Sequence, residues 1–189
     1  MIKSKIIYSQ NFQTTLKEWF DHYEGSKIFV ATEENVKKLW INQLNYIFHN
    51  YDIKAVVIPP GEQNKKIESV LQIWEFLSCN GADRKSLLIN IGGGMLTDLA
   101  GFASSTFKRG ISFLNVPTTL LAQVDASIGG KTGINFNGLK NEVGTFNEPE
   151  AVIINTSFLK TIDHSNFISG YAEMIKHALI KSPEHLADL

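Results

Sequence analysis

Short apolar runs alternate with amphipathic segments along most of this chain, and that alternation limits the fold more than any other feature. The run SLLINIG, before Gly93, is almost wholly apolar, as expected of a strand covered on both faces of its sheet. Strands that alternate with helices predict a mostly parallel, Rossmann-like α/β sheet flanked by helices. The predicted strands lie within 27–32, 53–61, 86–94, 111–117 and 151–155, and helical spacing is found at 34–50, 65–80 and 95–107.

The pattern changes after residue 128. The segment GGKTGINFNGLKNEVGTF is rich in Gly, Asn and Lys, which predicts a long loop or a β-ribbon in place of a helix. We therefore expect an α/β domain over 1–155, followed over 156–189 by the first helices of a mainly helical second domain. Apolar periodicity continues to Leu186 and Leu189, so we also expect that the sequence stops before its second half.

Composition excludes several classes of protein. The 189 residues carry a net charge of −1, so no basic excess points to nucleic acid or to an anionic membrane. No apolar run approaches the about 18 residues that a bilayer crossing needs, and the N-terminus lacks a signal-peptide pattern. The single cysteine, Cys79, excludes an internal disulfide and fits a reducing cytoplasm, where we expect it to pack at a helix end.

The segment INIGGGMLTD places three glycines between a predicted strand and a predicted helix. Glycine lets a ligand approach the main chain, and the helix start offers free N–H groups to a phosphate. The segment departs from the G-x-G-x-x-G pattern because Thr97 holds the third position, so a tight turn without a ligand stays open. Asp98, in the first helical turn, could complement the helix dipole or accept hydrogen bonds from a ligand.

Other polar residues follow the ends of predicted strands, where open parallel sheets bind their ligands. One of them, Asp125, stands in an apolar run predicted to be a helix. A buried carboxylate there would need a partner or a metal, and a solvated position at the helix edge is the alternative. The set comprises Glu62, Lys65, Thr118, Thr119, Asp125 and Lys131.

Three segments together resemble the 3-dehydroquinate synthase family of the sugar-phosphate cyclases. They are PPGEQNK, the block from GGGMLTDLAG to NGLKN, and GYAEMIKHALI. The resemblance covers essentially the whole chain and is most specific over 92–141. It implies an NAD-binding domain followed by the start of a metal- and substrate-binding domain.

The resemblance implies a lyase of the shikimate pathway, on the route to aromatic amino acids. Such an enzyme converts 3-deoxy-D-arabino-heptulosonate 7-phosphate to 3-dehydroquinate and phosphate while NAD is transiently reduced. Zinc or cobalt is the expected metal, a homodimer the expected assembly, and a small sugar phosphate the expected partner. We expect the 189-residue chain alone to be inactive.

The resemblance also assigns residues. Asp98 would face the nicotinamide, Glu62 and Lys65 the adenosine, and Lys131 and Asn141 the substrate phosphate. The full set carried over to NAD is Glu33, Asn35, Glu62, Lys65, Gly93, Gly94, Met95, Asp98, Thr118, Thr119, Lys131, Lys140, Phe158 and Thr161. The catalytic and substrate set is Asp125, Lys131, Asn141, Lys176 and Arg109, with Arg109 reaching the phosphate of a neighbouring subunit. Glu173 is the metal ligand.

Some positions depart from the family pattern or leave alternatives open. Glu33 stands where the family has Asp. His177 lies four residues after Glu173, a spacing that suits a metal on a helix. The resemblance makes neither His177 nor His185 a metal ligand, and we expect a packing or surface role for His177. Lys176 could instead pair with Glu173 and leave no metal there. Two further readings are another sugar-phosphate cyclase, such as 2-deoxy-scyllo-inosose synthase, and an NAD-binding fragment only.

Overall fold

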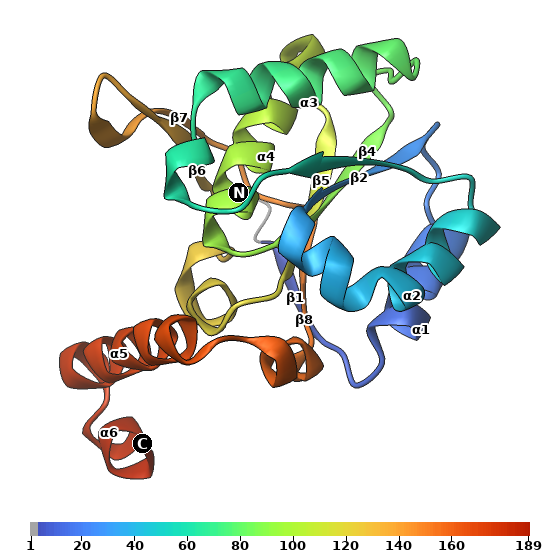
Figure 1. Cartoon of the computed structure of the whole chain (residues 1–189). Coiled ribbons are helices and arrows are strands. Elements are labelled where there is room, and N and C mark those ends of the chain that lie inside the picture. The colour runs from blue at the N-terminus through green and yellow to red at the C-terminus, as the bar shows by residue number, and fades with distance from the viewer. Residues whose placement is uncertain (1–3) are drawn as a thin grey trace.

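A parallel sheet of six strands forms the centre of the computed structural model, which describes residues 4–189 (Figure 1). This confirms the expected α/β fold. The structure does not describe the side chains of Ile41, Tyr46, Ile47, Pro183 and His185. The expectation that His185 is not a metal ligand therefore lies outside the described residues. In sheet order the strands are β1 (Lys5–Tyr8), β8 (Ala151–Ile154), β5 (Ser112–Pro117), β4 (Leu87–Gly92), β2 (Ile28–Glu33) and β3 (Lys54–Ile58).

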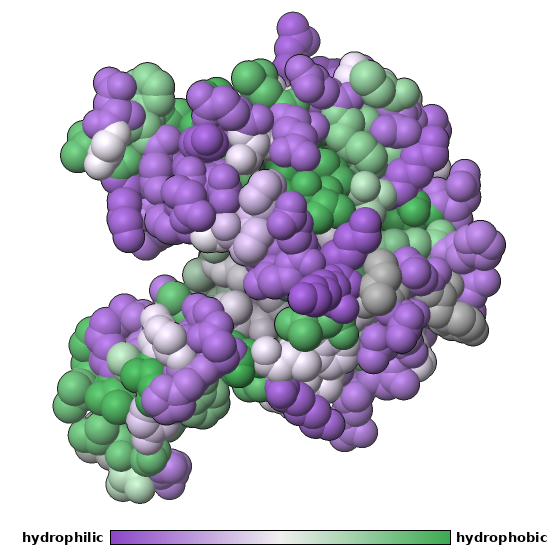
Figure 2. All heavy atoms as spheres, in the orientation of Figure 1, coloured by the Kyte–Doolittle hydropathy of each residue, from purple (hydrophilic) through white to green (hydrophobic). Residues whose placement is uncertain are grey.

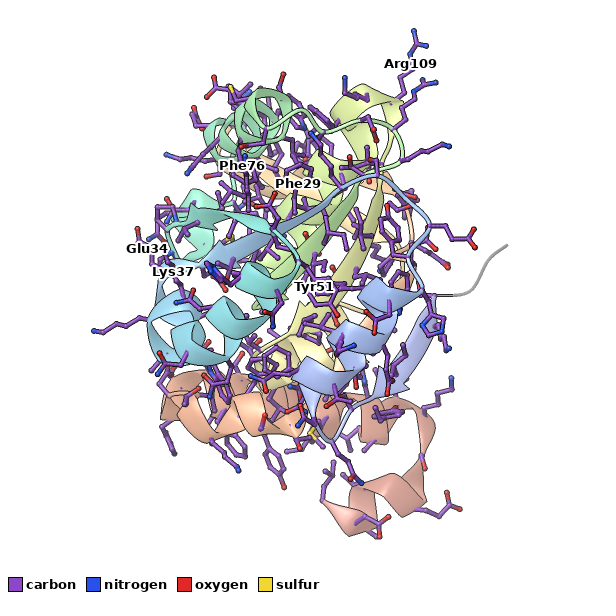
Figure 3. All side chains as sticks on the ribbon, turned by 90° about the vertical axis from the view of Figure 1, so that its right-hand side faces the viewer. Phe29, Glu34, Lys37, Tyr51, Phe76 and Arg109 are labelled. Atoms are coloured by element: carbon purple, nitrogen blue, oxygen red, sulfur yellow. The ribbon has the colours of Figure 1, made fainter. Side chains whose placement is uncertain are left out.

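Helices cover both faces of this sheet, because side chains of a strand alternate between them. On β4, Leu87 and Ile89 pack toward α1 (Phe12–Asp21) and α2 (Glu34–Asn50), whereas Leu88 packs toward α3 (Ile67–Cys79) and α4 (Gly94–Thr106). Figure 3 shows Phe29 of β2 beside Phe76 of α3, whose ring centroids lie 5.9 Å apart. Both faces of β4 are therefore buried, as its apolar sequence predicts.

The sequence analysis does not predict β1 or α1. β1 is an edge strand of only 4 residues, too short for its apolar residues to give a clear strand pattern. α1 does carry a helical signal, since buried Phe12, Leu16 and Phe20 recur every four residues and Asn11 caps its N-terminus. The expected packing role of Cys79 is wrong: this last residue of α3 is exposed.

The Gly- and Asn-rich segment is a β-ribbon, and of the two expected forms the loop is excluded. Strand β6 (Lys131–Phe136) pairs antiparallel with β7 (Leu139–Phe146) through a turn at Asn137 and Gly138, whose φ angles are 49° and 78°. Two successive positive φ angles are typical of the tight hairpin turn that Asn-Gly favours. The ribbon packs on α4 at Gly101, where a Cβ atom would lie 2.6 Å from Cγ2 of Thr132.

Two helices, α5 (His164–Lys181) and α6 (Pro183–Asp188), project from the sheet (Figure 1). The apolar periodicity that continues to Leu189 does not form one helix, because proline disfavours helical backbone in the residue before it and α5 ends before Ser182. Little of α5 is covered: its described buried residues are Gly170 and Ala178, and Figure 2 shows apolar residues gathered on this lobe. The boundary at residue 155 stays a prediction.

The apolar helix expected around Asp125 is reduced to a π-helical turn, Ala122–Ala126. Gly170 of α5 packs on the segment before this turn, and a Cβ atom there would lie 2.5 Å from the backbone nitrogen of Leu121. None of the helices in the described part of the chain has both the length and the apolar character that crossing a membrane requires.

Candidate functional site

The glycine turn lies at the carboxyl edge of the sheet, between β4 and α4. The N–H of Gly93 donates to Oε2 of Glu33, at the end of β2, over 2.8 Å, and the N–H of Thr118 donates to the carbonyl of Gly92. Glu33 is 5% exposed, and burial raises the pKa of its carboxyl above the usual range although the Gly93 N–H opposes that shift. At the carboxyl edge of the sheet, the Glu33 carboxyl is therefore buried and accepts a hydrogen bond from the backbone of the glycine turn.

Packing alone explains two of the three glycines. A Cβ atom at Gly92 would lie 2.5 Å from Cδ2 of Leu96, and one at Gly94 would lie 2.9 Å from Cβ of Ala126. At Gly93 the nearest atom would be Cγ2 of Thr119, at 3.2 Å, which is tight but tolerable. Packing therefore explains glycine less well at Gly93 than at Gly92 and Gly94, and Gly93 is the position where a ligand close to the backbone is the better explanation.

A buried lysine joins the first turns of α4 to the ribbon. Lys65 is 4% exposed, and its Nζ lies 2.5 Å from Oδ2 of Asp98 and 2.5 Å from Oδ1 of Asn141. Burial raises the pKa of Asp98 above its usual range, and the Lys65 ammonium opposes that shift. The structure thus places the Lys65 ammonium between two other predicted site residues, whereas the adenosine contact expected for it stays a prediction.

Sequence reasoning misses Asn135, which fastens the ribbon to the segment after β3. Its N–H donates to the carbonyl of Lys65 over 2.8 Å, and its Nδ2 donates to Oε1 of Glu62 over 2.9 Å. Its Oδ1 accepts from the N–H of Asn141 over 2.9 Å. No sequence pattern marks this role, because Glu62 and Lys65 stand far from Asn135 along the chain and meet it only in the fold.

A cleft of about 710 Å³ brings four predicted site residues together. Asp98 and Asp125 line one part of it, and Lys131 and Asn141 of the ribbon line another. The notch between the ribbon and the α5 lobe is visible in Figure 2. The Asp125 side chain is 53% exposed, so the solvated alternative holds and the buried carboxylate is excluded.

A larger hollow, of about 870 Å³, lies between α1 and α2. Its walls are mainly amide and hydroxyl side chains, and Lys17 within it is paired with Asp21 over 2.6 Å. This hollow offers no arrangement of reactive groups comparable to the cleft.

Helix α5 borders the cleft with three polar side chains. The Nε2 atom of His177 lies 3.1 Å from Oε1 of Glu173 and 3.7 Å from Oδ1 of Asp125. One possible ligand atom from each of Asp125, Glu173 and His177 lies within 4.8 Å of the other two. Carboxylate and imidazole donors fit a divalent metal such as zinc or cobalt. Lys176 also contacts Oε1 of Glu173, so the ion pair between these two residues, which the sequence left open, is present.

Arg109 does not reach this cleft. It is exposed, it adopts a φ of 73°, and it lines a hollow formed with Glu148 and Glu150. Figure 3 shows its side chain pointing away from the body of the molecule. This position suits a contact with another molecule, but the cross-subunit role stays a prediction.

The remaining residues predicted to bind NAD lie on several elements. Phe158 is 1% exposed and packs on Phe12 and Trp40, so it belongs to the core, and the cofactor contact expected for it stays a prediction. Thr161 accepts a hydrogen bond from Nε1 of Trp40. The other positions are Asn35, exposed in the first turn of α2; Met95, half-buried in α4; Thr119, whose Oγ1 accepts from the N–H of Ala122; and Lys140, exposed on β7.

A parallel sheet with a glycine turn at its carboxyl edge and a polar cleft beside it is typical of enzymes that bind phosphate-bearing ligands. The chain belongs to the 3-dehydroquinate synthase N-terminal family, which it matches over residues 55–169. The 3-dehydroquinate synthase of Parabacteroides distasonis is 47% identical over 189 residues, which are 100% of this chain and 54% of that protein. These matches confirm the resemblance drawn from the sequence.

Solved structures agree with the fold. A 2-epi-5-epi-valiolone synthase from Streptomyces hygroscopicus subsp. jinggangensis 5008, with NAD+ and Zn2+ bound, superposes with a TM-score of 0.88 at 29% identity, over 97% of this chain and 51% of that one. A 2-deoxy-scyllo-inosose synthase complexed with carbaglucose-6-phosphate, NAD+ and Co2+ has a TM-score of 0.84 at 23% identity, over 92% and 48%. The chain thus spans about half the length of the proteins it matches.

Proposed function

We propose that this chain is the cofactor-binding half of an enzyme that converts 3-deoxy-D-arabino-heptulosonate 7-phosphate to 3-dehydroquinate and phosphate. The observation that carries the proposal is the shared cleft of Asp98, Asp125, Lys131 and Asn141 beside the glycine turn. Membership of the family and the NAD+ and zinc of a solved relative at 29% identity support it.

The proposed roles follow from charge and position. Lys131 offers an ammonium and Asn141 an amide N–H to the substrate phosphate, at the ribbon wall of the cleft. Asp98 accepts a hydrogen bond from the nicotinamide amide, and the N–H groups at the start of α4 face the pyrophosphate. Asp125 accepts hydrogen bonds from substrate hydroxyls, since its exposed carboxylate points into the same space.

NAD would supply a hydride acceptor, and a divalent metal held in part by Glu173 would polarise the hydroxyl that is oxidised. This chain's own contribution at α5 is to present Glu173 at the margin of the cleft, with Lys176 and His177 as its neighbours. A homodimer in which Arg109 serves the neighbouring subunit, and a cytoplasmic location, are part of the proposal.

The test is a product assay on the whole protein, with NAD and zinc supplied. We expect phosphate release and 3-dehydroquinate from the carboxylate-bearing heptulosonate phosphate, and loss of both in Lys131→Met. The same change at exposed Lys66, outside the cleft, is the control. Turnover only with sugar phosphates that lack the carboxylate would favour the second candidate, another sugar-phosphate cyclase, for which the 29% identity to a valiolone synthase is the supporting observation.

A further inference from the structure

We propose that Lys65 is a positioning residue that couples the cofactor side of the cleft to its phosphate side. The inference rests on the proposed function and goes beyond it, because it assigns Lys65 an action through two other residues. The juxtaposition that carries it is the buried ammonium of Lys65 between Asp98 of α4 and Asn141 of the ribbon.

The first step concerns burial. Lys65 is 4% exposed although lysine is rarely buried without partners. Two oxygens, each 2.5 Å from its Nζ, replace the water that this ammonium has lost. A buried lysine has few alternative positions. A movement of the Asp98 or the Asn141 oxygen would therefore move the ammonium, and with it the other oxygen.

The second step concerns the ribbon. Between the pairs Ile134–Val143 and Phe136–Leu139, one residue of β6 faces three of β7, so β7 is bulged there. Asn141 lies in this bulge with a φ of 54°, a left-handed conformation that costs energy in residues other than glycine. Bulges beside active sites commonly re-aim a side chain.

The third step concerns what holds the bulge. The N–H of Asn141 donates to Oδ1 of Asn135, and its own Oδ1 accepts from Lys65. Asn135 is in turn fixed to the backbone of Lys65 and to Glu62. The carboxamide oxygen of Asn141 is thereby engaged, which turns the Nδ2 donor of the same group toward other partners.

The consequence is a linkage between two ligands. A phosphate held by Asn141 fixes the carboxamide that Lys65 contacts, and Lys65 then holds the Asp98 carboxylate in the orientation that a nicotinamide amide needs. Phosphate should tighten NAD, and NAD should tighten phosphate by the same factor, since coupling between two binding sites is reciprocal.

The experiment measures the NAD dissociation constant of the 189-residue chain by calorimetry, without and with saturating inorganic phosphate. Saturation is set for each variant from its own phosphate titration, so a weaker phosphate site alone leaves the ratio of the two constants unchanged. We expect phosphate to tighten NAD roughly five-fold or more in the wild type, at the lower end of typical couplings. The ratio should fall to about one in Lys65→Met and recover in part in Lys65→Arg.

Two ribbon variants keep the test independent of whether Lys65→Met folds. Asn141→Gly keeps the positive φ and removes the carboxamide, so it too should lose the coupling. Asn137→Gly makes the same change at another positive φ, in the hairpin turn and outside the cleft, and should keep the wild-type ratio. A wild-type ratio in Asn141→Gly, or in a folded Lys65→Met, overturns the inference.

The outcomes also separate this inference from the proposed function. If the wild type binds both ligands and phosphate leaves the NAD constant unchanged, the coupling fails while the proposed function stands. If the wild type binds neither NAD nor phosphate, the proposed function fails and this inference fails with it.

Discussion

The carboxyl edge of the sheet and helix α5 both carry predicted site residues, but they hold them in different ways. At the edge, Glu33 and Lys65 are 5% and 4% exposed and are bonded to groups on other elements. On α5, Lys176 and His177 are 53% and 40% exposed on their side chains, and Lys176 contacts a residue of its own helix. Burial and hydrogen bonds to other elements hold Glu33 and Lys65 in place. Lys176 and His177 contact Glu173 of their own helix.

This difference teaches which part of the site the chain can build from its own described residues. The carboxyl edge of the sheet is formed by the ends of parallel strands. The ribbon is hydrogen-bonded through Asn135 to the segment that follows β3. Among the described contacts, Gly170 of α5 packs on Leu121, and His177 of α5 lies near Asp125. We therefore expect substitutions at the edge to change stability and binding strongly, and those on α5 to do so weakly.

The largest expected effect is on the core that supports the edge. Phe113→Ala on β5, at 1% exposed, should lower the free energy of unfolding by about 3–5 kcal/mol because it opens a cavity between strand and helices. Ile180→Ala on α5, at 76% exposed, should change it by less than about 0.5 kcal/mol. Urea unfolding followed by circular dichroism measures both, and similar losses in the two variants would break the comparison.

The glycine turn should show the next largest effect. Gly94→Ala pushes a Cβ atom to 2.9 Å from Ala126, so we expect a loss of about 1–3 kcal/mol in unfolding free energy. Gly93→Ala meets Thr119 at 3.2 Å and should cost less stability while still weakening NAD. Thermal unfolding and NAD titration on both variants separate the two causes. Equal NAD affinity in Gly93→Ala and the wild type would count against a ligand at this turn.

The buried carboxyl of Glu33 should make stability depend on pH. Because burial raises its pKa in the folded state, the folded chain binds more protons than the unfolded chain between the ordinary glutamate pKa and the raised value. The contribution of Glu33 to stability therefore falls as the pH rises through that window. Glu33→Gln should make this fall smaller and leave the part that Asp98 contributes, because burial raises the pKa of Asp98 as well; urea unfolding at several pH values would measure the change. An unchanged pH profile in the variant would show that another group causes it.

The smallest expected effect is on α5. Glu173→Gln removes a partner of Lys176 and His177, but exposed ion pairs are worth at most about 1 kcal/mol, so unfolding should change little. We expect the chain alone to hold no stoichiometric zinc, because Lys176 competes for the Glu173 carboxylate. Elemental analysis after dialysis tests this. One tightly held zinc per chain, lost in His177→Ala, would instead make Asp125, Glu173 and His177 a metal site.

The sequence predicts what depends on periodicity and on short motifs. The central strands could be expected, and so could the meeting of Asp98, Asp125 and Lys131, because strand ends converge at one edge of a parallel sheet. Asn141 is expected there only from the family resemblance, and the ribbon is one of two forms that the sequence leaves open. The edge strand β1 could not be expected, since a run of 4 residues gives neither a clear alternation nor an apolar stretch of typical strand length.

Contacts between distant residues are the part that periodicity cannot supply. The bond from Gly93 to Glu33, and the position of Lys65 between Asp98 and Asn141, depend on a fold that brings separate segments within hydrogen-bond distance. The exposure of α5 could not be predicted either, because an apolar helical face gives the same sequence pattern whether or not another element covers it.

The measurement that tests the central claim most directly is calorimetric titration of NAD into the 189-residue chain, compared with Asp98→Asn. This change keeps the shape of the side chain and an oxygen for Lys65 while it removes the charge. We expect one NAD site per chain in the wild type and an affinity about ten-fold lower in Asp98→Asn, with Asp188→Asn, on exposed α6, as the unchanged control. Absence of NAD binding, or equal affinity in the wild type and Asp98→Asn, would contradict the assignment of the cofactor site to this edge.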